Sequence, residues 1–128
     1  MANHVCHFEI PADDIGALEG FYGGVFGWSF ERMPGDMEYH LIKTSEGSEC
    51  GTSGGDVCGG IMLRQDPHQG PTNYICVDSI DESLEKAHAA GATDIVGKSA
   101  VPKMGWFAVL LDPQKNPFGL WQDDANAS

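Results

Sequence analysis

Hydrophobic positions in the first half of the chain predict a strand, a helix and two further strands. Residues 4–10 alternate as a strand, and Asp14 stands where a helix N-cap is expected. The helix carries one apolar stripe, and its glycines weaken it so that packing must hold it in place. The stripe consists of Ile15, Leu18, Tyr22 and Val25, and strands at 38–43 and 57–64 follow. The Gly- and Ser-rich stretch 44–56 is expected to be a loop that holds a third, short strand or acts as a lid.

The second half of the chain repeats this order of elements. Residues 73–77 predict a strand, and Ser79 with Glu82 forms a capping box before a helix that Gly91 can terminate. Strands are then expected at 93–96, 106–111 and 118–122. A polar stretch with two prolines and a glycine separates the halves. We therefore expect a single domain, 1–128, made of module one (1–64), a linker (65–71), module two (72–123) and a tail (124–128).

Composition and charge limit the partners of this domain. The chain has 128 residues, 41% of them apolar, and its 19 Asp and Glu against 7 Lys and Arg give a formal net charge of -12. Binders of nucleic acid or of anionic membranes need Lys and Arg, so neither partner is expected. The longest apolar run, 107–111, is far shorter than the ~18 residues of a membrane span. The acidic charge is expected first of all to keep the domain soluble; the alternative is that it attracts a cationic ligand, and for a ligand-binding domain it favours a neutral or cationic molecule.

The first residues and the cysteines bear on cellular location. Residues 1–4 lack the charged and apolar regions of a secretion signal, so we expect a cytoplasmic protein. In that compartment the four cysteines, Cys6, Cys50, Cys58 and Cys76, are expected to be reduced thiols. The dinucleotide-binding glycine motif, the P-loop and the nucleophile elbow do not occur in the sequence.

Three passages carry a resemblance to a known family. They run from His7-Phe8-Glu9-Ile10 to Trp28, from Val77-Asp78-Ser79-Ile80 to Gly91-Ala92, and over Asp112-Pro113-Gln114-Lys115-Asn116-Pro117-Phe118-Gly119-Leu120-Trp121-Gln122. In this order they resemble the glyoxalase, bleomycin-resistance and extradiol-dioxygenase superfamily, the vicinal-oxygen-chelate proteins, in a glyoxalase-like branch that lacks most of the metal ligands. The resemblance implies an α+β fold of two βαβββ modules, whose sheets curl into an open mixed barrel around a cleft with the helices outside. It also implies a homodimer.

The resemblance also defines four positions for a divalent metal, one in the first and one in the last strand of each module. His7 matches the first of these positions, seven residues before Asp14. The second falls on Thr72, or on Tyr74 if the strands are matched by hydrophobic register, and neither is a usual ligand. The family's last-strand Glu is replaced by Gly119, and no acid or imidazole occurs at 60–63. We therefore expect no metal cofactor.

His7 leaves three hypotheses open. It is a hydrogen-bonded residue without a metal, or it is a general base whose ring Glu9 orients, since its ordinary pKa suits that role. In the third hypothesis His7 and Glu9, which share one face of their strand, join a histidine such as His40 in an atypical metal site.

Aromatic residues favour a small-molecule site. Gly119 and Trp121 share one face of the last strand, and the side chain missing at 119 leaves room for an aromatic ligand or for Trp121 itself. We expect the ligand-binding residues to be Thr72, Tyr74, Trp106, Gly119 and Trp121, with Trp28 as a further aromatic candidate. The leading hypothesis is a domain that binds a small aromatic, neutral or cationic molecule without the metal. The alternatives are a lyase, isomerase or dioxygenase that uses His7 and Glu9, and a structural module whose purpose is its dimer surface.

Overall fold

The computed structural model describes residues 3–35, 38–45 and 57–128. Within these residues the chain forms eight strands and two helices. They divide between two compact units, one over Cys6–Thr72 and the other over Asn73–Ser128 with the first residues of the chain. Module one comprises β1 (His4–Ala12), α1 (Ile15–Phe26), β2 (Ser29–Arg32), β3 (Tyr39–Lys43) and β4 (Cys58–Leu63). Module two comprises β5 (Thr72–Cys76), α2 (Ile80–Ala89), β6 (Thr93–Val101), β7 (Gly105–Leu111) and β8 (Pro117–Asp123).

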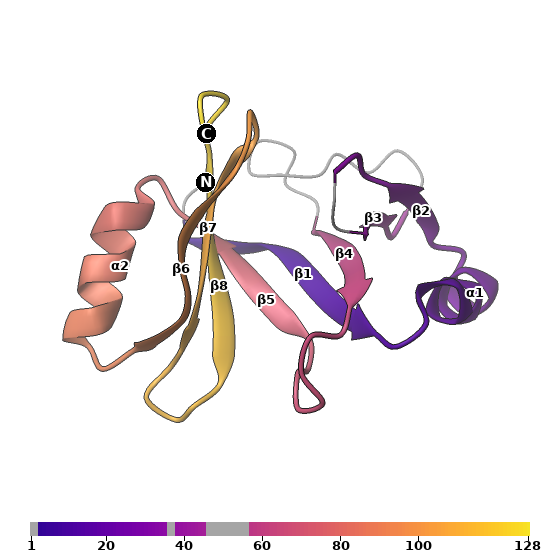
Figure 1. Cartoon of the computed structure of the whole chain (residues 1–128), viewed down its shortest axis with the longest axis horizontal. Coiled ribbons are helices and arrows are strands. Elements are labelled where there is room, and N and C mark those ends of the chain that lie inside the picture. The colour runs from indigo at the N-terminus through magenta and orange to yellow at the C-terminus, as the bar shows by residue number, and fades with distance from the viewer. Residues whose placement is uncertain (1–2, 36–37, 46–56) are drawn as a thin grey trace. The chain divides into compact units, whose positions relative to one another are not determined.

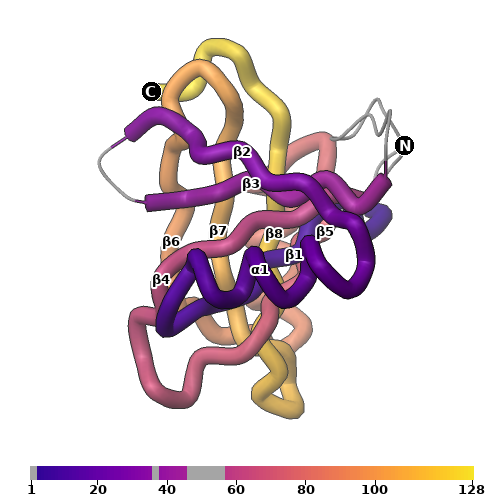
Figure 2. The backbone as a smooth tube through the Cα atoms, turned by 90° about the vertical axis from the view of Figure 1, so that its right-hand side faces the viewer, coloured from indigo at the N-terminus to yellow at the C-terminus, as the bar shows by residue number. Residues whose placement is uncertain are grey.

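In module one the strands lie in the order β2-β3-β4-β1. β1 runs parallel to β4, whereas β3 is antiparallel to both of its neighbours. α1 covers one face of this sheet, where Ile15 packs with Ile42 and Ile61. Figure 2 looks onto α1 and shows it in front of β4. Every second side chain of these strands therefore points to the face away from α1.

α1 begins at the N-cap that the sequence predicts, but one part of its expected buried stripe is wrong. Asp14 Oδ1 accepts a hydrogen bond from the Ala17 N–H at 3.1 Å, and Gly27 ends the helix with a φ of 75°. Ile15 is buried, as expected, whereas Val25 is 59% exposed. Val25 lies one turn after Phe21, which is 55% exposed, so this row of side chains faces solvent instead of the sheet.

Among the described residues, module one holds a strand directly after its helix that the sequence did not predict. It is β2, which follows α1 directly and pairs with β3 so that Phe30 lies opposite Ile42. Phe30 is the one β2 residue that packs against the core cluster. Because β2 has four residues and only one apolar side chain, it shows too little alternation for the sequence to predict a strand. Residues 46–56, which include most of the expected lid, lie outside the described residues.

Module two repeats the topology of module one. Its strands lie in the order β5-β8-β7-β6, and β5 runs parallel to β8. Ser79 Oγ caps α2 by accepting a hydrogen bond from the Glu82 N–H at 3.2 Å. α2 lies along one face of this sheet, where Ile80 packs with Leu110 and Leu120 (Figure 1). The α+β class and the two βαβββ modules are thus confirmed, and none of the described helices is long and apolar enough to cross a membrane.

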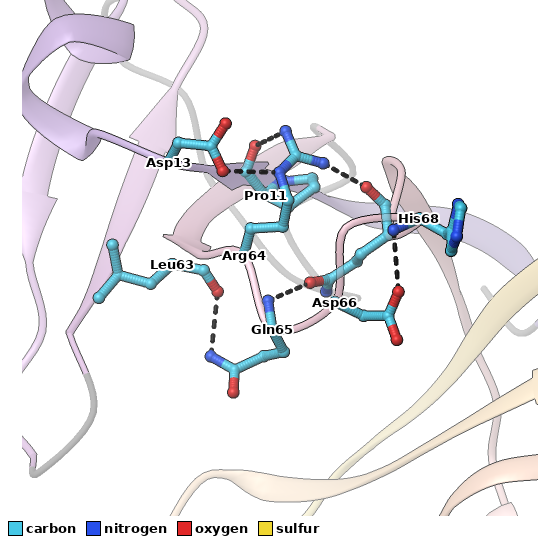
Figure 3. A network of polar contacts seen from close by, with 8 residues as sticks. Pro11, Asp13, Leu63, Arg64, Gln65, Asp66 and His68 are labelled. Atoms are coloured by element: carbon cyan, nitrogen blue, oxygen red, sulfur yellow. Dashed lines mark hydrogen bonds and ion pairs between the residues drawn. The ribbon is translucent and has the colours of Figure 1, made fainter.

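Arg64 anchors the linker to module one (Figure 3). Its Nε donates to Asp13 Oδ1 at 3.0 Å, and its terminal nitrogens donate to the carbonyl oxygens of Gln69 and Pro11. The Gln65 N–H donates to Gln69 Oε1 at 2.7 Å and closes the turn. Because of these bonds, the linker belongs to the same compact unit as module one.

The cysteines differ from the expectation of reduced thiols. None of the cysteines that the structure describes is free, and Cys6, Cys58 and Cys76 are disulfide-bonded. The expectation is therefore wrong for these three residues. Spacing along the chain does not show which sulfur atoms approach each other in the fold, and this approach decides whether a disulfide forms.

Candidate functional site

A group of polar side chains lies on the face of module one away from α1. Phe8, Ile10 and Ala12 of β1 pack in the α1-side cluster, so His7 and Glu9, which alternate with them, point to the opposite face. Tyr39 of β3 lies on this opposite face as well, because Ile42, three residues further along the same strand, packs in the α1-side cluster. The sheet thus brings together three polar side chains from two strands.

Tyr39 stands between His7 and Glu9. His7 Nε2 lies 2.6 Å from Tyr39 Oη, which in turn donates to Glu9 Oε2 at 3.0 Å. The tyrosine hydroxyl has one proton, and it goes to the carboxylate, so His7 must supply the other proton through Nε2–H. The rings of His7 and Tyr39 are stacked with an interplanar angle of 16°. Glu9 therefore positions the His7 ring through the tyrosine hydroxyl.

Burial sets the protonation of His7. Desolvation lowers the pKa of His7 from 6.5 to about 4, because the charged ring loses its hydration. The ring is neutral at pH 7, in agreement with its role as an Nε2–H donor to Tyr39. A neutral, hydrogen-bonded His7 fits the hypothesis of a residue without a metal better than that of a general base with an ordinary pKa.

Glycines in the last strand of each module make room for a tyrosine ring. Gly60 lies opposite Glu9, and a Cβ at Gly60 would come within 2.0 Å of Tyr39 Oη. In module two, Gly119 lies opposite Tyr74, and a Cβ at Gly119 would come within 2.3 Å of the Tyr74 ring. Glu9 and Tyr74 each precede the N-cap of their helix by five residues, so Gly60 and Gly119 are equivalent positions of the two modules.

These residues do not fit the family's divalent metal. Of the four positions that the resemblance defines, only His7 has a ligand side chain, and its Nε2 is bonded to Tyr39. Thr72 offers only a hydroxyl, and the other two positions are the glycines beneath the tyrosine rings. In the described part of the chain, no three His, Cys, Asp or Glu side chains form a group that could hold a metal ion.

His40 does not join His7 and Glu9, so it cannot be the third ligand of the atypical metal site. It lies opposite Ile61, a residue of the α1-side cluster, and thus on the other face of the sheet. Its Nδ1 lies 2.6 Å from Glu19 Oε2 of α1, and its Nε2 lies 3.0 Å from Glu38 Oε2. The sequence places His40 one residue after Tyr39, and strand alternation sends the two side chains to opposite faces.

The structure brings together only part of the expected ligand-binding set. Thr72 and Tyr74 share one face of β5, and Gly119 and Trp121 lie opposite Tyr74 and Cys76 on that same face of the module. The room above Gly119 is filled by Tyr74, whereas Trp121 lies over Gly105, where a Cβ would come within 2.6 Å of the indole.

Trp106 and Trp28 belong to the helix-covered faces. Trp106 packs against the α2-side cluster and donates through Nε1 to Asp124 Oδ2 at 2.9 Å, with Lys98 Nζ 4.6 Å from its ring centroid. Trp28 stacks on Tyr22 of α1, with ring centroids 4.9 Å apart. Trp106 therefore lies on the other face of its sheet from Tyr74, Gly119 and Trp121, and Trp28 packs on the α1 side of module one.

Sequence reasoning missed Tyr39, although a signal for it exists. The strand predicted at 38–43 alternates, and Ile42 must be on its buried face, so Tyr39 falls on the face of His7 and Glu9. The side-chain-free Gly60 in the strand opposite is the second sign, because a glycine inside a strand often marks a close approach of another group.

The duplicated βαβββ topology defines the class of this protein, a two-module α+β domain. Residues 4–45 match the family model described as Bleomycin resistance protein-like N-terminal. Together with its relatives and its fold, this match makes the chain similar to proteins of the glyoxalase, bleomycin-resistance and dioxygenase superfamily, the vicinal-oxygen-chelate proteins.

Similar proteins are found among curated sequences and solved structures. Proteins of Mycobacterium bovis and Mycobacterium tuberculosis named provisionally as glyoxylase CFP32 are 30% identical over 118 residues, which cover 88% of this chain. This chain spans only 41% of their length. The Streptomyces coelicolor methylmalonyl-CoA epimerase, in complex with 2-nitronate-propionyl-CoA, has a TM-score of 0.73 at 14% identity, with 98% of this chain and 100% of that chain covered. A superfamily member from Vibrio splendidus 12B01 has a TM-score of 0.65 at 14% identity, with 91% and 96% covered.

Proposed function

We propose that this chain binds a small aromatic, neutral or cationic molecule on the face of module one that carries His7, Tyr39 and Glu9, without a divalent metal. The observation that carries the proposal is the position of the Tyr39 hydroxyl. It lies above Gly60, where a metal-binding arrangement needs a ligand side chain, and it bonds to both His7 and Glu9.

The chemistry of this face supports a ligand of that kind. Small-molecule sites commonly combine apolar and aromatic surface with a few placed polar groups, and His7, Tyr39 and Glu9 supply polar groups and an aromatic ring on one face of the sheet. The carboxylate of Glu9 and the net charge of -12 favour a cationic or neutral ligand over an anionic one. In module two, Thr72, Tyr74, Gly119 and Trp121 stay candidates for ligand contact, whereas Trp106 faces the α2-side cluster.

Metal content tests the first half of the proposal. We expect elemental analysis of protein purified without chelator or affinity tag to find far less than one divalent ion per chain. His7→Ala should leave this content unchanged, because His7 is bonded to Tyr39. A content near one ion per wild-type chain that is lost in His7→Ala would contradict the proposal.

Ligand titration tests the second half. Bleomycin, a cationic molecule with aromatic rings, and a panel of small aromatic amines serve as probes in isothermal calorimetry. We expect Tyr39→Phe to weaken the binding of a responding probe by about tenfold, the effect of losing one hydrogen bond. Tyr22→Phe is the matched control, since Tyr22 stacks on Trp28 on the α1 side. Equal affinity in both variants, or no binding of any probe, would refute the assignment of this site.

A metal-free lyase or isomerase is the second candidate, and one observation favours it. The hydrogen bonds from His7 through Tyr39 to Glu9 form an unbroken path along which a proton can move. Methylmalonyl-CoA, the substrate named for a protein of the same fold, is a suitable probe in deuterated water. Deuterium incorporation by the wild type that is lost in His7→Ala would favour the enzyme, whereas no incorporation would favour the binding domain.

A cytoplasmic location stays a prediction, and the disulfide-bonded cysteines argue against a reducing compartment. Disulfides are rare in reducing compartments, and Cys6, Cys58 and Cys76 are disulfide-bonded. The homodimer also stays a prediction.

A further inference from the structure

His40 joins α1 to the start of β3 through two carboxylates. Its Nδ1 lies 2.6 Å from Glu19 Oε2 of α1, and its Nε2 lies 3.0 Å from Glu38 Oε2, at the residue before β3. The His40 side chain is only 14% exposed, so neighbouring residues enclose most of the ring. We call these three residues, His40, Glu19 and Glu38, the His40 cluster.

The His40 cluster needs one proton more than a neutral imidazole supplies. A carboxylate has only acceptor oxygens, whereas a neutral imidazole has one N–H and one bare nitrogen. With a single N–H, the bare nitrogen of His40 would face a carboxylate oxygen lone pair to lone pair. Both contacts are hydrogen bonds only when the cluster has gained a second proton. Imidazole is the group of the three that takes up a proton between about pH 5 and 8.

The charges around the ring favour an imidazolium. The carboxylates of Glu19 and Glu38 face the ring, and Arg32 of β2, which lies opposite His40 in the strand pairing, adds one opposing charge. α1 and β4, which lie on this face, have no charged residue other than Glu19. The surroundings of the ring are therefore net negative. The other titratable residues of α1, β2 and β3 are directed elsewhere, namely Tyr22, which stacks on Trp28, and Glu31, Tyr39 and Lys43, which alternate to the other face.

Loss of the second proton should open one contact of the cluster and keep the other. The shorter bond, from Nδ1–H of His40 to Glu19, is satisfied by a ring with one proton. The bare Nε2 then repels the Glu38 carboxylate. Because the Glu38 side chain is 41% exposed and that of Glu19 is 22% exposed, Glu38 is the carboxylate that can turn to water.

Tyr39 stands between Glu38 and His40 in the chain and projects to the other face, where its Oη bonds to His7 and Glu9. We propose that His40 is a positioning residue for Tyr39, which holds the tyrosine in place when its ring has two protons and releases the preceding residue when it has one. This inference rests on the proposed function, since it implies that the Tyr39 face binds its ligand more tightly in acid than in alkaline solution.

The ring nitrogens of His40 provide the first test. ¹⁵N NMR of the full chain should show two protonated ring nitrogens at pH 5.5 and one, Nδ1, at pH 8. A ring with the same number of protons at both pH values would overturn the inference.

Glu38→Gln separates the contact from the proton. Its amide group donates to a bare Nε2 of His40 and accepts from Nε2–H, so the contact should persist at both pH values. Asp94→Asn is the matched control, because it makes the same kind of change beside a histidine of module two, where Asp94 Oδ1 lies 2.6 Å from His88 Nε2. It should behave as the wild type does.

The position of Tyr39 can be followed without a ligand. Burial lowers the pKa of His7 to about 4, so its ring stays neutral between pH 5.5 and 8 and its resonances report the contact with Tyr39. In the wild type these resonances should shift between the two pH values. The protection of amides 38–41 against hydrogen exchange should be about tenfold lower at pH 8, the effect of losing one hydrogen bond. Glu38→Gln should abolish both changes, and equal behaviour of Glu38→Gln and Asp94→Asn would overturn the inference.

Ligand affinity tests the link to the site, with bleomycin and small aromatic amines as probes. At pH 8, Glu38→Gln should bind a responding probe about fivefold more tightly than the wild type, whereas at pH 5.5 the two should bind equally. Equal binding at both pH values would overturn the positioning role. If no probe binds, the proposed function fails, and the ring spectra with the His7 resonances still decide whether His40 positions Tyr39.

Discussion

Lowering the pH should destabilise the protein through His7. Because burial lowers the pKa of His7 to about 4, the folded state binds fewer protons than the unfolded state, in which the pKa is near 6.5. The free energy of unfolding therefore has its full value above about pH 6.5. It falls as the pH drops below that value, and the contribution of His7 is lost below about pH 4.

The magnitude follows from the difference between the two pKa values. At ~1.36 kcal/mol for each pKa unit, the whole contribution is roughly 3 kcal/mol, and about 2 kcal/mol of it is lost by pH 5. The free energy of unfolding of a domain is typically about 5–15 kcal/mol. A change of about 2 kcal/mol is therefore measurable in a urea titration.

Urea unfolding at pH 7.5, 6 and 5 provides the assay. His7→Gln removes the titrating ring but keeps an N–H donor for Tyr39 Oη. Between pH 7.5 and 5, the loss of unfolding free energy in this variant should therefore be about 2 kcal/mol smaller than the loss in the wild type. His68→Gln, which removes an exposed imidazole of the linker, is the control. If the wild type and His7→Gln lose the same free energy over this range, His7 is not buried as a neutral ring and the reasoning fails.

Three further substitutions test the contacts around the site. Tyr39→Phe removes the hydroxyl between His7 and Glu9 and should lower stability by about 2 kcal/mol, seen as a thermal midpoint roughly 6–10 °C lower; an unchanged midpoint would refute the hydrogen bonds. Gly119→Ala should cost about 1–3 kcal/mol in urea unfolding because its Cβ meets the Tyr74 ring, whereas Gly20→Ala, in open space on α1, should stabilise by up to about 1 kcal/mol; equal effects would refute the close packing. Arg64→Met should speed amide hydrogen exchange across 65–71 without changing that of α2, and unchanged exchange in the linker would show that Arg64 does not anchor it.

The fold could be predicted because its signals are local and occur twice. Asp14 and Ser79 cap their helices, and the strands before and after each helix alternate, so the βαβββ order can be read from either half. β2 could not be predicted, because Phe30 is its one core side chain and its partner strand supplies the rest of the pairing. Val25 was assigned to the buried stripe because helical spacing gives rows of side chains but not the angle at which the helix meets the sheet.

The site could be predicted only in part, since it depends on contacts between strands. Alternation placed His7 and Glu9 on one face, as the structure has them. It could not show that the ring of Tyr39 crosses to Gly60, because that contact follows from the register of β3 against β4. The aromatic side chain of Trp106 correctly indicated that this residue packs against other residues. Which face of the sheet it occupies depends on the pairing of β7 with β8, where Trp106 lies opposite Gln122 on the α2 side.

The register also explains why the metal positions and the tyrosines must change together. Gly60 and Gly119 occupy equivalent places, and in both modules a tyrosine ring lies within 2.3 Å of where a Cβ would be. Real atoms cannot approach so closely, so a glutamate at either position requires the tyrosine to move away, and a tyrosine in its present place requires glycine beneath it. Restoring a carboxylate at one of these positions alone would therefore displace the ring without building a metal site. In module one it would also break the hydrogen bonds that join His7 to Glu9, so the metal-binding arrangement and the tyrosine-bonded arrangement exclude each other at the same place in the sheet.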